Sequence, residues 1–249
     1  MKHLRSSLGA VACALAVAAV LGAGGAPPDD PRWTVLRHLL RGSDFEAAVP
    51  VARALATQFP DDGRASFYLG LVLHKSKRHA EALALLERAA AAPASDFAEA
   101  PHAVHYLAWC RYYLGDLEGA RAAFTAHANA FPNYDDSHFG LGLVAFDEDR
   151  LAEAEASFRH ALALLNAQEG ARRDRAKNLA RLGDVLLRQE RLAEAEQCYR
   201  RSVETMEGNA EAWSKLARVL DRLGRAGEAT DARARQEAIR ARSAGEASP

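Results

Sequence analysis

The chain has 249 residues, of which 49% are hydrophobic and 26% charged, and its 32 basic and 33 acidic side chains leave a formal net charge of −1. This balance gives no support for binding of nucleic-acid phosphates, which relies on a basic surface. The length would suit one large domain or two small ones. A repeat array grows one unit at a time, so a single continuous array could also extend over the whole chain.

The N-terminus has the pattern of a secretory signal. Lys2 and Arg5 precede the apolar run Leu8–Leu21, and small residues follow it. This run of about 14 residues is shorter than the roughly 20 that a membrane span needs. We therefore expect a signal peptide over residues 1–25. With the Ala-, Arg- and Leu-rich composition, it indicates export to a bacterial periplasm or cell envelope. An uncleaved N-terminal anchor and a lipoprotein modified at Cys13 are the alternatives.

The next segment, residues 29–62, predicts a first pair of helices. Pro31 is compatible with the first position of the first helix. The segment Ser43–Glu46 has the pattern of a capping box for the second helix. Pro50 then falls inside that helix, where it should kink the chain at a cost of about 3 kcal/mol. We expect this terminal unit to be irregular.

Two insertions lengthen the pattern in the middle of the chain. Asp96 and Glu99 are placed to cap an extended helix that runs to Leu114. Residues 169–175 are rich in charge and in helix formers. We interpret them as lengthening the helices on either side, not as a linker.

The clearest unit is residues 135–168. Two apolar helices, over 139–146 and 151–162, are joined by a short charged turn. Gly142 in the first and Ala154 in the second are small enough to let the helices approach closely. Such a hairpin cannot bury both of its apolar faces alone, so it should be stable only when stacked on copies of itself.

The end of the chain reads as a terminating unit. Asn209 should cap the first helix of the last pair. Thr230, Asp231 and Arg233 stand where apolar residues would face a further unit, so the last helix is expected to be a solvated cap. Residues 244–249 are small and polar, and we predict a disordered tail there.

An alanine in the second helix of each pair recurs at a regular distance. Successive members are separated by 34, 38, 34, 41 and 34 residues. Each distance is 34 plus zero, four or seven, and insertions of about one or two helical turns keep the same face. The alanines are Ala48, Ala82, Ala120, Ala154, Ala195 and Ala229. A Leu-Gly pair in the first helix recurs at 69–70, 141–142 and 182–183.

With this period and this pattern of small and large residues, the chain resembles the tetratricopeptide repeat family. The resemblance implies an all-α fold, a right-handed α-solenoid of about six helix-turn-helix repeats over residues 29–243. The repeats would span residues 29–62, 63–96, 101–134, 135–168, 176–209 and 210–243. It also implies that the chain binds a protein or peptide partner.

In such hairpins the first helices line the concave wall, and a stripe at positions i, i+4 and i+7 faces it. A groove rich in aromatic side chains would hold an apolar helix or an extended peptide, with the rings as anchors. The same rings could instead pack between neighbouring helices. Eight residues at these positions are the predicted partner-binding residues, and we call them the aromatic stripe. They are Phe67, Leu71, His105, Trp109, Tyr112, Phe139, Leu143 and Phe146.

These features predict a non-catalytic protein–protein interaction scaffold. The alternative is a structural factor for envelope, pilus or outer-membrane assembly, acting through self-association or its convex face. The sequence has no P-loop, HExxH, GxSxG or Cys/His nucleophile signature. We therefore expect no enzyme activity, no cofactor and no small-molecule substrate, with membrane contact only through an N-terminal signal or anchor.

No metal site is expected either. His102 and His105 lie three residues apart, a spacing that can hold a metal, but no third ligand is identifiable nearby in the sequence. Cys110 and Cys198 fall in different repeats and in no CxxC pair, so they should be buried core residues.

Overall fold

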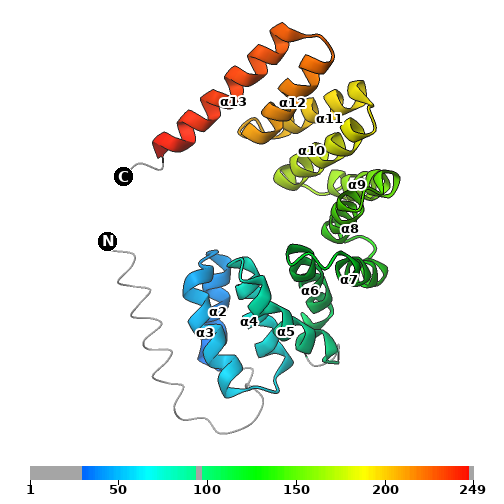
Figure 1. Cartoon of the computed structure of the whole chain (residues 1–249). Helices are drawn as coiled ribbons and strands as arrows, with labels where there is room; N and C mark the ends of the chain where they lie inside the picture. Colours follow the sequence, from blue (N-terminus) through cyan, green and yellow to red (C-terminus); the bar gives the residue numbers. More distant parts are fainter. Residues whose placement is uncertain (1–29, 94–96, 247–249) are drawn as a thin grey trace. The chain divides into compact units, whose positions relative to one another are not determined.

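The computed structural model describes residues 30–93 and 97–246, with side chains described as far as residue 244. These residues form twelve α-helices and one short 3-10 helix, with no strand among them, so the predicted all-α solenoid fold is confirmed (Figure 1). Within the described residues, no helix combines the length and the apolar character that crossing a membrane requires. The predicted signal peptide and Cys13 lie outside them.

The chain divides into two compact units, and the first spans Met1–His127. Its helices pack in chain order, each one against the next, through α6. They are α2 (Pro31–Arg41), α3 (Phe45–Gln58), α4 (Gly63–Lys75), α5 (His79–Ala91), the 3-10 helix η2 (Ala100–His102), α6 (Ala103–Tyr113) and α7 (Leu117–Ala130), whose last turn passes into the second unit.

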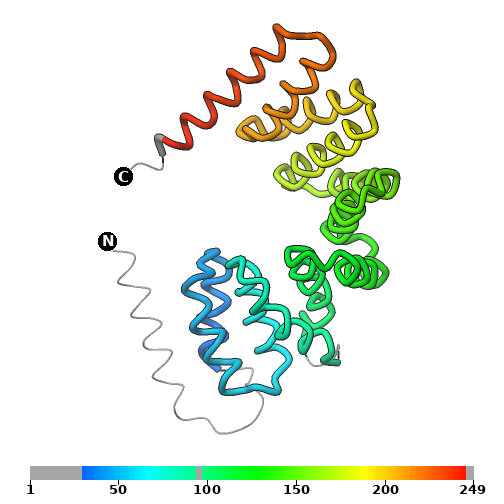
Figure 2. Tube along the Cα trace, viewed as in Figure 1, coloured from blue at the N-terminus to red at the C-terminus, as the bar shows by residue number. Residues whose placement is uncertain are grey.

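The second unit spans Ala128–Pro249. It consists of three helix pairs, and each helix again packs on the next one in the chain (Figure 2). The helices are α8 (Asp135–Asp147), α9 (Leu151–Asn166), α10 (Arg172–Arg188), α11 (Leu192–Thr205), α12 (Ala210–Arg222) and α13 (Ala226–Glu246).

Small residues lie where the two helices of a pair cross, as the sequence predicts. All six of the recurring alanines are completely buried. In the Leu-Gly pairs, a Cβ added to Gly70 would lie 2.7 Å from Leu86, and one added to Gly183 would lie 2.7 Å from Tyr199. Real Cβ atoms do not approach so closely, so these glycines allow a large side chain of the second helix to pack on the backbone of the first.

The turn inside each pair also repeats, in a way that residue type alone does not show. In all six turns one residue has a positive φ, between 55° and 84°, and the next residue donates its N–H to the carbonyl five positions back. This is the Schellman motif that ends many helices. The six left-handed residues are Ser43, Lys77, Gly115, Asp149, Glu190 and Gly224, and their spacing equals that of the alanines.

The start of α3 differs from the expected capping box. The N-cap residue is Asp44, whose carboxylate accepts a hydrogen bond from the backbone N–H of Ala47 at 3.1 Å. Ser43 instead occupies the left-handed position of the turn. Pro50 does lie inside α3, and the helix continues past it to Gln58.

The expected extension of the helix ending near Leu114 is wrong. Asp96 lies outside the described residues, and Glu99 makes no cap hydrogen bond. Pro101, which lacks an N–H, lies in η2, and α6 begins only after it. The carboxylate of Glu99 accepts a hydrogen bond from the phenol of Tyr68 at 2.6 Å instead.

Two further boundaries also differ. Residues 167–171 form a turn between α9 and α10, in which Gly170 has φ 81°, so only residues 172–175 of the charged insertion lengthen a helix. At the other end, α13 includes residues 244–246. The predicted tail over these three residues is therefore helix, and residues 247–249 lie outside the description.

Candidate functional site

The aromatic stripe lies on the first helices of three pairs, in α4, α6 and α8, as predicted. Most of its members are buried, however. Leu71, Tyr112 and Phe146 are partly exposed. The buried members are Phe67, His105, Trp109, Phe139 and Leu143, which are 2–8% exposed. The structure therefore gives these five a role in packing, and their binding to a partner stays a prediction.

In the first unit the buried rings contact one another. The indole N–H of Trp109 donates to Nε2 of His105 at 3.2 Å. The same indole meets Phe124 of α7 edge to face, with 5.1 Å between ring centroids. Phe67 lies 5.7 Å from Phe97 by the same measure. Such ring contacts, within α6 and between neighbouring segments of the chain, stabilise the unit.

In the second unit the stripe is capped by cations. Nζ of Lys177 lies 4.1 Å from the ring centroid of Phe139, and the guanidinium carbon of Arg188 lies 5.1 Å from that of Phe146. Both distances suit cation–π attraction. These rings are thus covered by side chains of α10, the first helix of the next pair.

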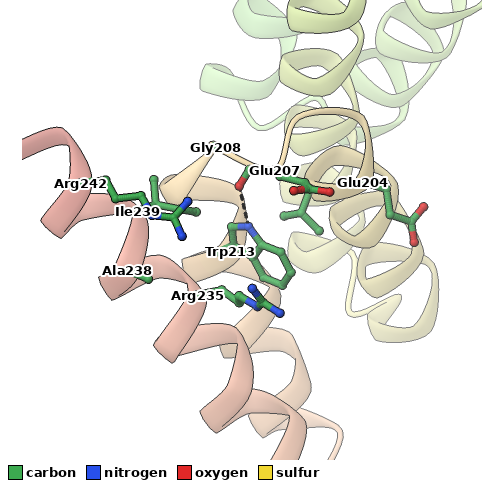
Figure 3. Close-up of a pocket in the computed structure, with 9 residues that line it drawn as sticks. Glu204, Glu207, Gly208, Trp213, Arg235, Ala238, Ile239 and Arg242 are labelled. Atoms are coloured by element: carbon green, nitrogen blue, oxygen red, sulfur yellow. Dashed lines mark hydrogen bonds between the residues drawn. The ribbon is translucent and has the colours of Figure 1, made fainter. Parts of the chain in front are cut away.

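A pocket of about 470 Å³ opens between the end of α11 and the last pair of helices, α12 and α13. Its volume falls in the range of about 300–1,000 Å³ that is typical of ligand sites. The pocket exists because α13 has 21 residues and α12 has 13, so the end of α13 reaches past the start of α12. We call it the Trp213 pocket; its lining residues are Val203, Glu204, Glu207, Gly208, Trp213, Arg235, Ala238, Ile239 and Arg242 (Figure 3).

The indole of Trp213 lies at the centre of this pocket (Figure 3). Its N–H donates to the backbone carbonyl of Glu207 at 2.9 Å, which fixes the orientation of the ring. Ile239 adds apolar surface beside the ring, and the buried side chain of Val203 forms part of the pocket wall. The pocket therefore offers an aromatic surface on a rigid helix.

Charged groups of both signs surround the ring. Arg235 and Arg242 extend from α13, whereas Glu204 belongs to α11 (Figure 3). Within the described residues, neither guanidinium forms a hydrogen bond or an ion pair, unlike Arg225 at the start of the same helix, which contacts Glu196 and Glu228. The two arginines of the pocket are thus available to a carboxylate from outside the chain.

The sequence did not predict this pocket. Thr230, Asp231 and Arg233 indicated a solvated cap in α13, and these three residues are indeed exposed. The signal that could have indicated a site is Trp213, the sole aromatic residue of the last repeat, residues 210–243. The distance between residues 213 and 242 in the sequence gives no direct sign that they line one pocket.

The comparisons with known families decide the classification. A family model described as tetratricopeptide repeat matches residues 36–97 and 180–246, which is more than half of the chain, and a second model with the same description matches residues 136–208. The chain belongs to the tetratricopeptide repeat family. The pair α6 and α7 lies outside both matched ranges, and this is the pair that follows the first insertion. No curated protein matches the sequence.

Several solved structures of tetratricopeptide repeat type share the fold. The chain matches a protein chain in the crystal structure of the APC/C hetero-tetramer Cut9-Hcn1 with a TM-score of 0.71 and 19% identity. The match covers 84% of this chain but only 39% of the matched chain. It matches pilF of Pseudomonas aeruginosa with a TM-score of 0.63 and 17% identity, over 83% of this chain and 87% of that one.

A third match is YrrB, described as a TPR protein with an unusual peptide-binding site, with a TM-score of 0.54, 15% identity and coverage of 76% and 91%. These identities are low, so the likeness concerns the fold alone. Members of this repeat family are generally non-catalytic scaffolds for protein–protein interactions, and this chain has their architecture.

Proposed function

We propose that this tetratricopeptide repeat protein is a non-catalytic scaffold that binds a segment of a protein partner in the Trp213 pocket. The observation that carries the proposal is the pair of unpaired guanidinium groups, Arg235 and Arg242, beside an oriented indole ring. Trp and Arg are the residue types that most often dominate binding energy at protein interfaces.

The charges of the pocket specify the chemistry of the segment. A carboxylate suits Arg235 and Arg242, because a guanidinium can bind it through two parallel hydrogen bonds. An apolar side chain next to that carboxylate would cover Trp213 and Ile239. Glu204 and Glu207 would repel a run of acidic residues. We therefore expect a segment with a single acidic group beside an apolar residue, not a polyacidic one.

The aromatic stripe has a smaller part in this proposal. Its partly exposed members, Leu71, Tyr112 and Phe146, are candidates for additional contact with a protein partner. The pattern of residues 1–25 supports the further proposal that the protein works in the periplasm or cell envelope. Cell fractionation with an antibody against the chain would test that location.

A displayed library of random peptides, selected on the purified full chain, tests the pocket. We expect selected peptides to share an acidic residue next to an apolar one. Their affinity should fall at least tenfold in Arg235→Glu and in Trp213→Ala. Arg41→Glu makes the same change of charge at an exposed residue of α2, which does not line the pocket, and should leave affinity unchanged.

Circular dichroism would establish that each variant is folded before its binding is measured. Selection of no peptide, or peptides that bind Arg235→Glu as well as the wild-type chain, would count against the pocket as the binding site. A concentration-dependent oligomer that Arg235→Glu dissociates would favour the alternative of self-association.

A further inference from the structure

Three side chains that commonly bind transition metals meet in the first unit. His74 lies in the last turn of α4, His79 is the first residue of α5, and Cys110 lies near the end of α6. One potential ligand atom from each lies within 4.8 Å of the others. Among the described residues, no other group of three His, Cys, Asp or Glu side chains meets this condition.

The distances are close to those of a tetrahedral zinc site. Zn–S bonds of about 2.3 Å and Zn–N bonds of about 2.0–2.1 Å place sulfur and nitrogen about 3.6 Å apart, and two nitrogens about 3.4 Å apart. Sγ of Cys110 lies 3.6 Å from Nδ1 of His74. The ring centroids of His74 and His79 are 5.1 Å apart. The ligand atom of His79 lies within 4.8 Å of those of His74 and Cys110, so binding of zinc would draw it closer to them by at most about 1.4 Å.

The surroundings of these side chains also suit a metal. Nδ1 of His79 is buried and has no hydrogen-bond partner within the described part of the chain, an arrangement that costs free energy unless a partner is supplied. The phenol ring of Tyr113 stacks on the imidazole of His79, with 4.4 Å between centroids and 15° between planes.

The other histidine cluster of this unit is different. Nδ1 of His102 and Nε2 of His127 lie 3.1 Å apart and share a hydrogen bond, and His105 accepts from the indole of Trp109. The ligand atoms of His102, His105 and His127 do not all come within 4.8 Å of one another. The spacing of His102 and His105 in the sequence therefore does not produce a set of three ligands, in contrast to His74, His79 and Cys110.

We propose that His74, His79 and Cys110 bind one zinc ion, with a fourth coordination position open to water or to an external ligand. One thiolate and two imidazoles form a ligand set that suits zinc, and three protein ligands with one open position is a common arrangement. Zinc would replace the proton of the Cys110 thiol, which is released to solvent as the Zn–S bond forms.

Cobalt(II) in place of zinc provides a direct test, since a thiolate ligand gives cobalt a charge-transfer band in the near ultraviolet. The variant Cys13→Ala/Cys198→Ala leaves Cys110 as the sole cysteine of the chain and does not alter the site. We expect this variant, prepared without an affinity tag, to show the band with one equivalent of cobalt, and zinc to displace it. Absence of the band would overturn the proposal.

The histidine ligands are tested in the same background. His74→Gln and His79→Gln should each weaken cobalt binding at least tenfold, whereas His138→Gln in the second unit should not. Circular dichroism of the metal-free variants would show whether each is folded. If both His74→Gln and His79→Gln still showed the charge-transfer band and bound cobalt with the affinity of the parent variant, the assignment of these two ligands would be overturned. In the wild-type chain, zinc should raise the melting temperature, because a ligand that binds only the folded state stabilises it.

Discussion

A Cβ atom added to Gly142 in α8 would lie 2.6 Å from Cε1 of Phe158 in α9. The ring of Phe158 is completely buried, so it cannot move aside into solvent. We therefore expect Gly142→Ala to destabilise the protein by about 1–3 kcal/mol, the usual cost of forcing an extra group into a packed core. Urea unfolding followed by circular dichroism would measure it.

Gly227→Ala is the matched control for this substitution. Gly227 lies in the first turn of α13, and a Cβ added there meets nothing within 4 Å. Because alanine favours helix more than glycine does, this change should stabilise the chain or leave it unchanged. Equal effects of the two substitutions would mean that contact with Phe158 does not explain the glycine at position 142.

This contact shows why the sequence predicted the fold well. The glycines and alanines at helix crossings are required by the close approach of two backbones, and stacking repeats that requirement in every pair. Gly70, Gly142 and Gly183 each face a large side chain of the next helix. The spacing of small residues therefore predicts the positions of the helix crossings directly. Insertions of four and seven residues do not obscure that spacing.

The left-handed turns lead to a second prediction. Lys77 has φ 62° in the turn between α4 and α5 and is exposed. This conformation raises the free energy of a residue with a Cβ by about 1–2 kcal/mol, whereas glycine adopts it without that cost. After allowance for the greater freedom of glycine in the unfolded chain, Lys77→Gly should stabilise the protein by roughly 0.5–1 kcal/mol.

The equivalent position in the last pair provides the reverse test. Gly224 has φ 74°, and nothing lies near its missing Cβ, so Gly224→Ala should cost about 1 kcal/mol through the backbone conformation alone. Thermal and urea unfolding would measure the change in unfolding free energy for both Lys77→Gly and Gly224→Ala. If Lys77→Gly lowers stability, the side chain of Lys77 contributes more than the backbone strain removes.

A third prediction concerns the aromatic stripe. Trp109 is 5% exposed and packs on Phe124, so Trp109→Ala should lower the free energy of unfolding by about 3–5 kcal/mol. Leu114 is 45% exposed, and its replacement by Ala should change that free energy by no more than about 0.5 kcal/mol. A small effect for Trp109→Ala would show that the ring is dispensable for packing, and it would return Trp109 to the candidates for partner binding.

The sequence could not distinguish packing from binding for these rings. Periodicity shows which residues share a face of a helix, but it does not show what covers that face. Phe139 and Phe146 lie beneath Lys177 and Arg188 of α10. No property of residues 139–146 indicates that these two cations cover the rings. The cluster of His74, His79 and Cys110 was hidden for the same reason, since Cys110 joins the histidines only through the packing of α6 against α4 and α5.

A fourth prediction follows from His138 in α8. Burial lowers the pKa of His138 below its ordinary value of 6.5, and the nearby ring of His160 acts in the same direction; a hydrogen bond to the carbonyl of Pro132 and the charge of Asp135 oppose the shift only in part. Between the lowered pKa of the folded chain and 6.5, the unfolded chain therefore binds more protons at His138 than the folded chain does. Stability should fall as the pH drops from 6.5, because the unfolded state is then favoured.

His138→Gln should weaken this dependence, since a glutamine amide does not titrate and can still donate to Pro132. We expect the difference in unfolding free energy between pH 7 and pH 5 to be smaller in His138→Gln than in the wild-type chain. His38→Gln, the same substitution at an exposed histidine of α2, is the matched control. Urea unfolding at several pH values measures all three proteins. Parallel stability curves for His138→Gln and the wild-type chain would mean that His138 takes up a proton equally well in the folded and unfolded states.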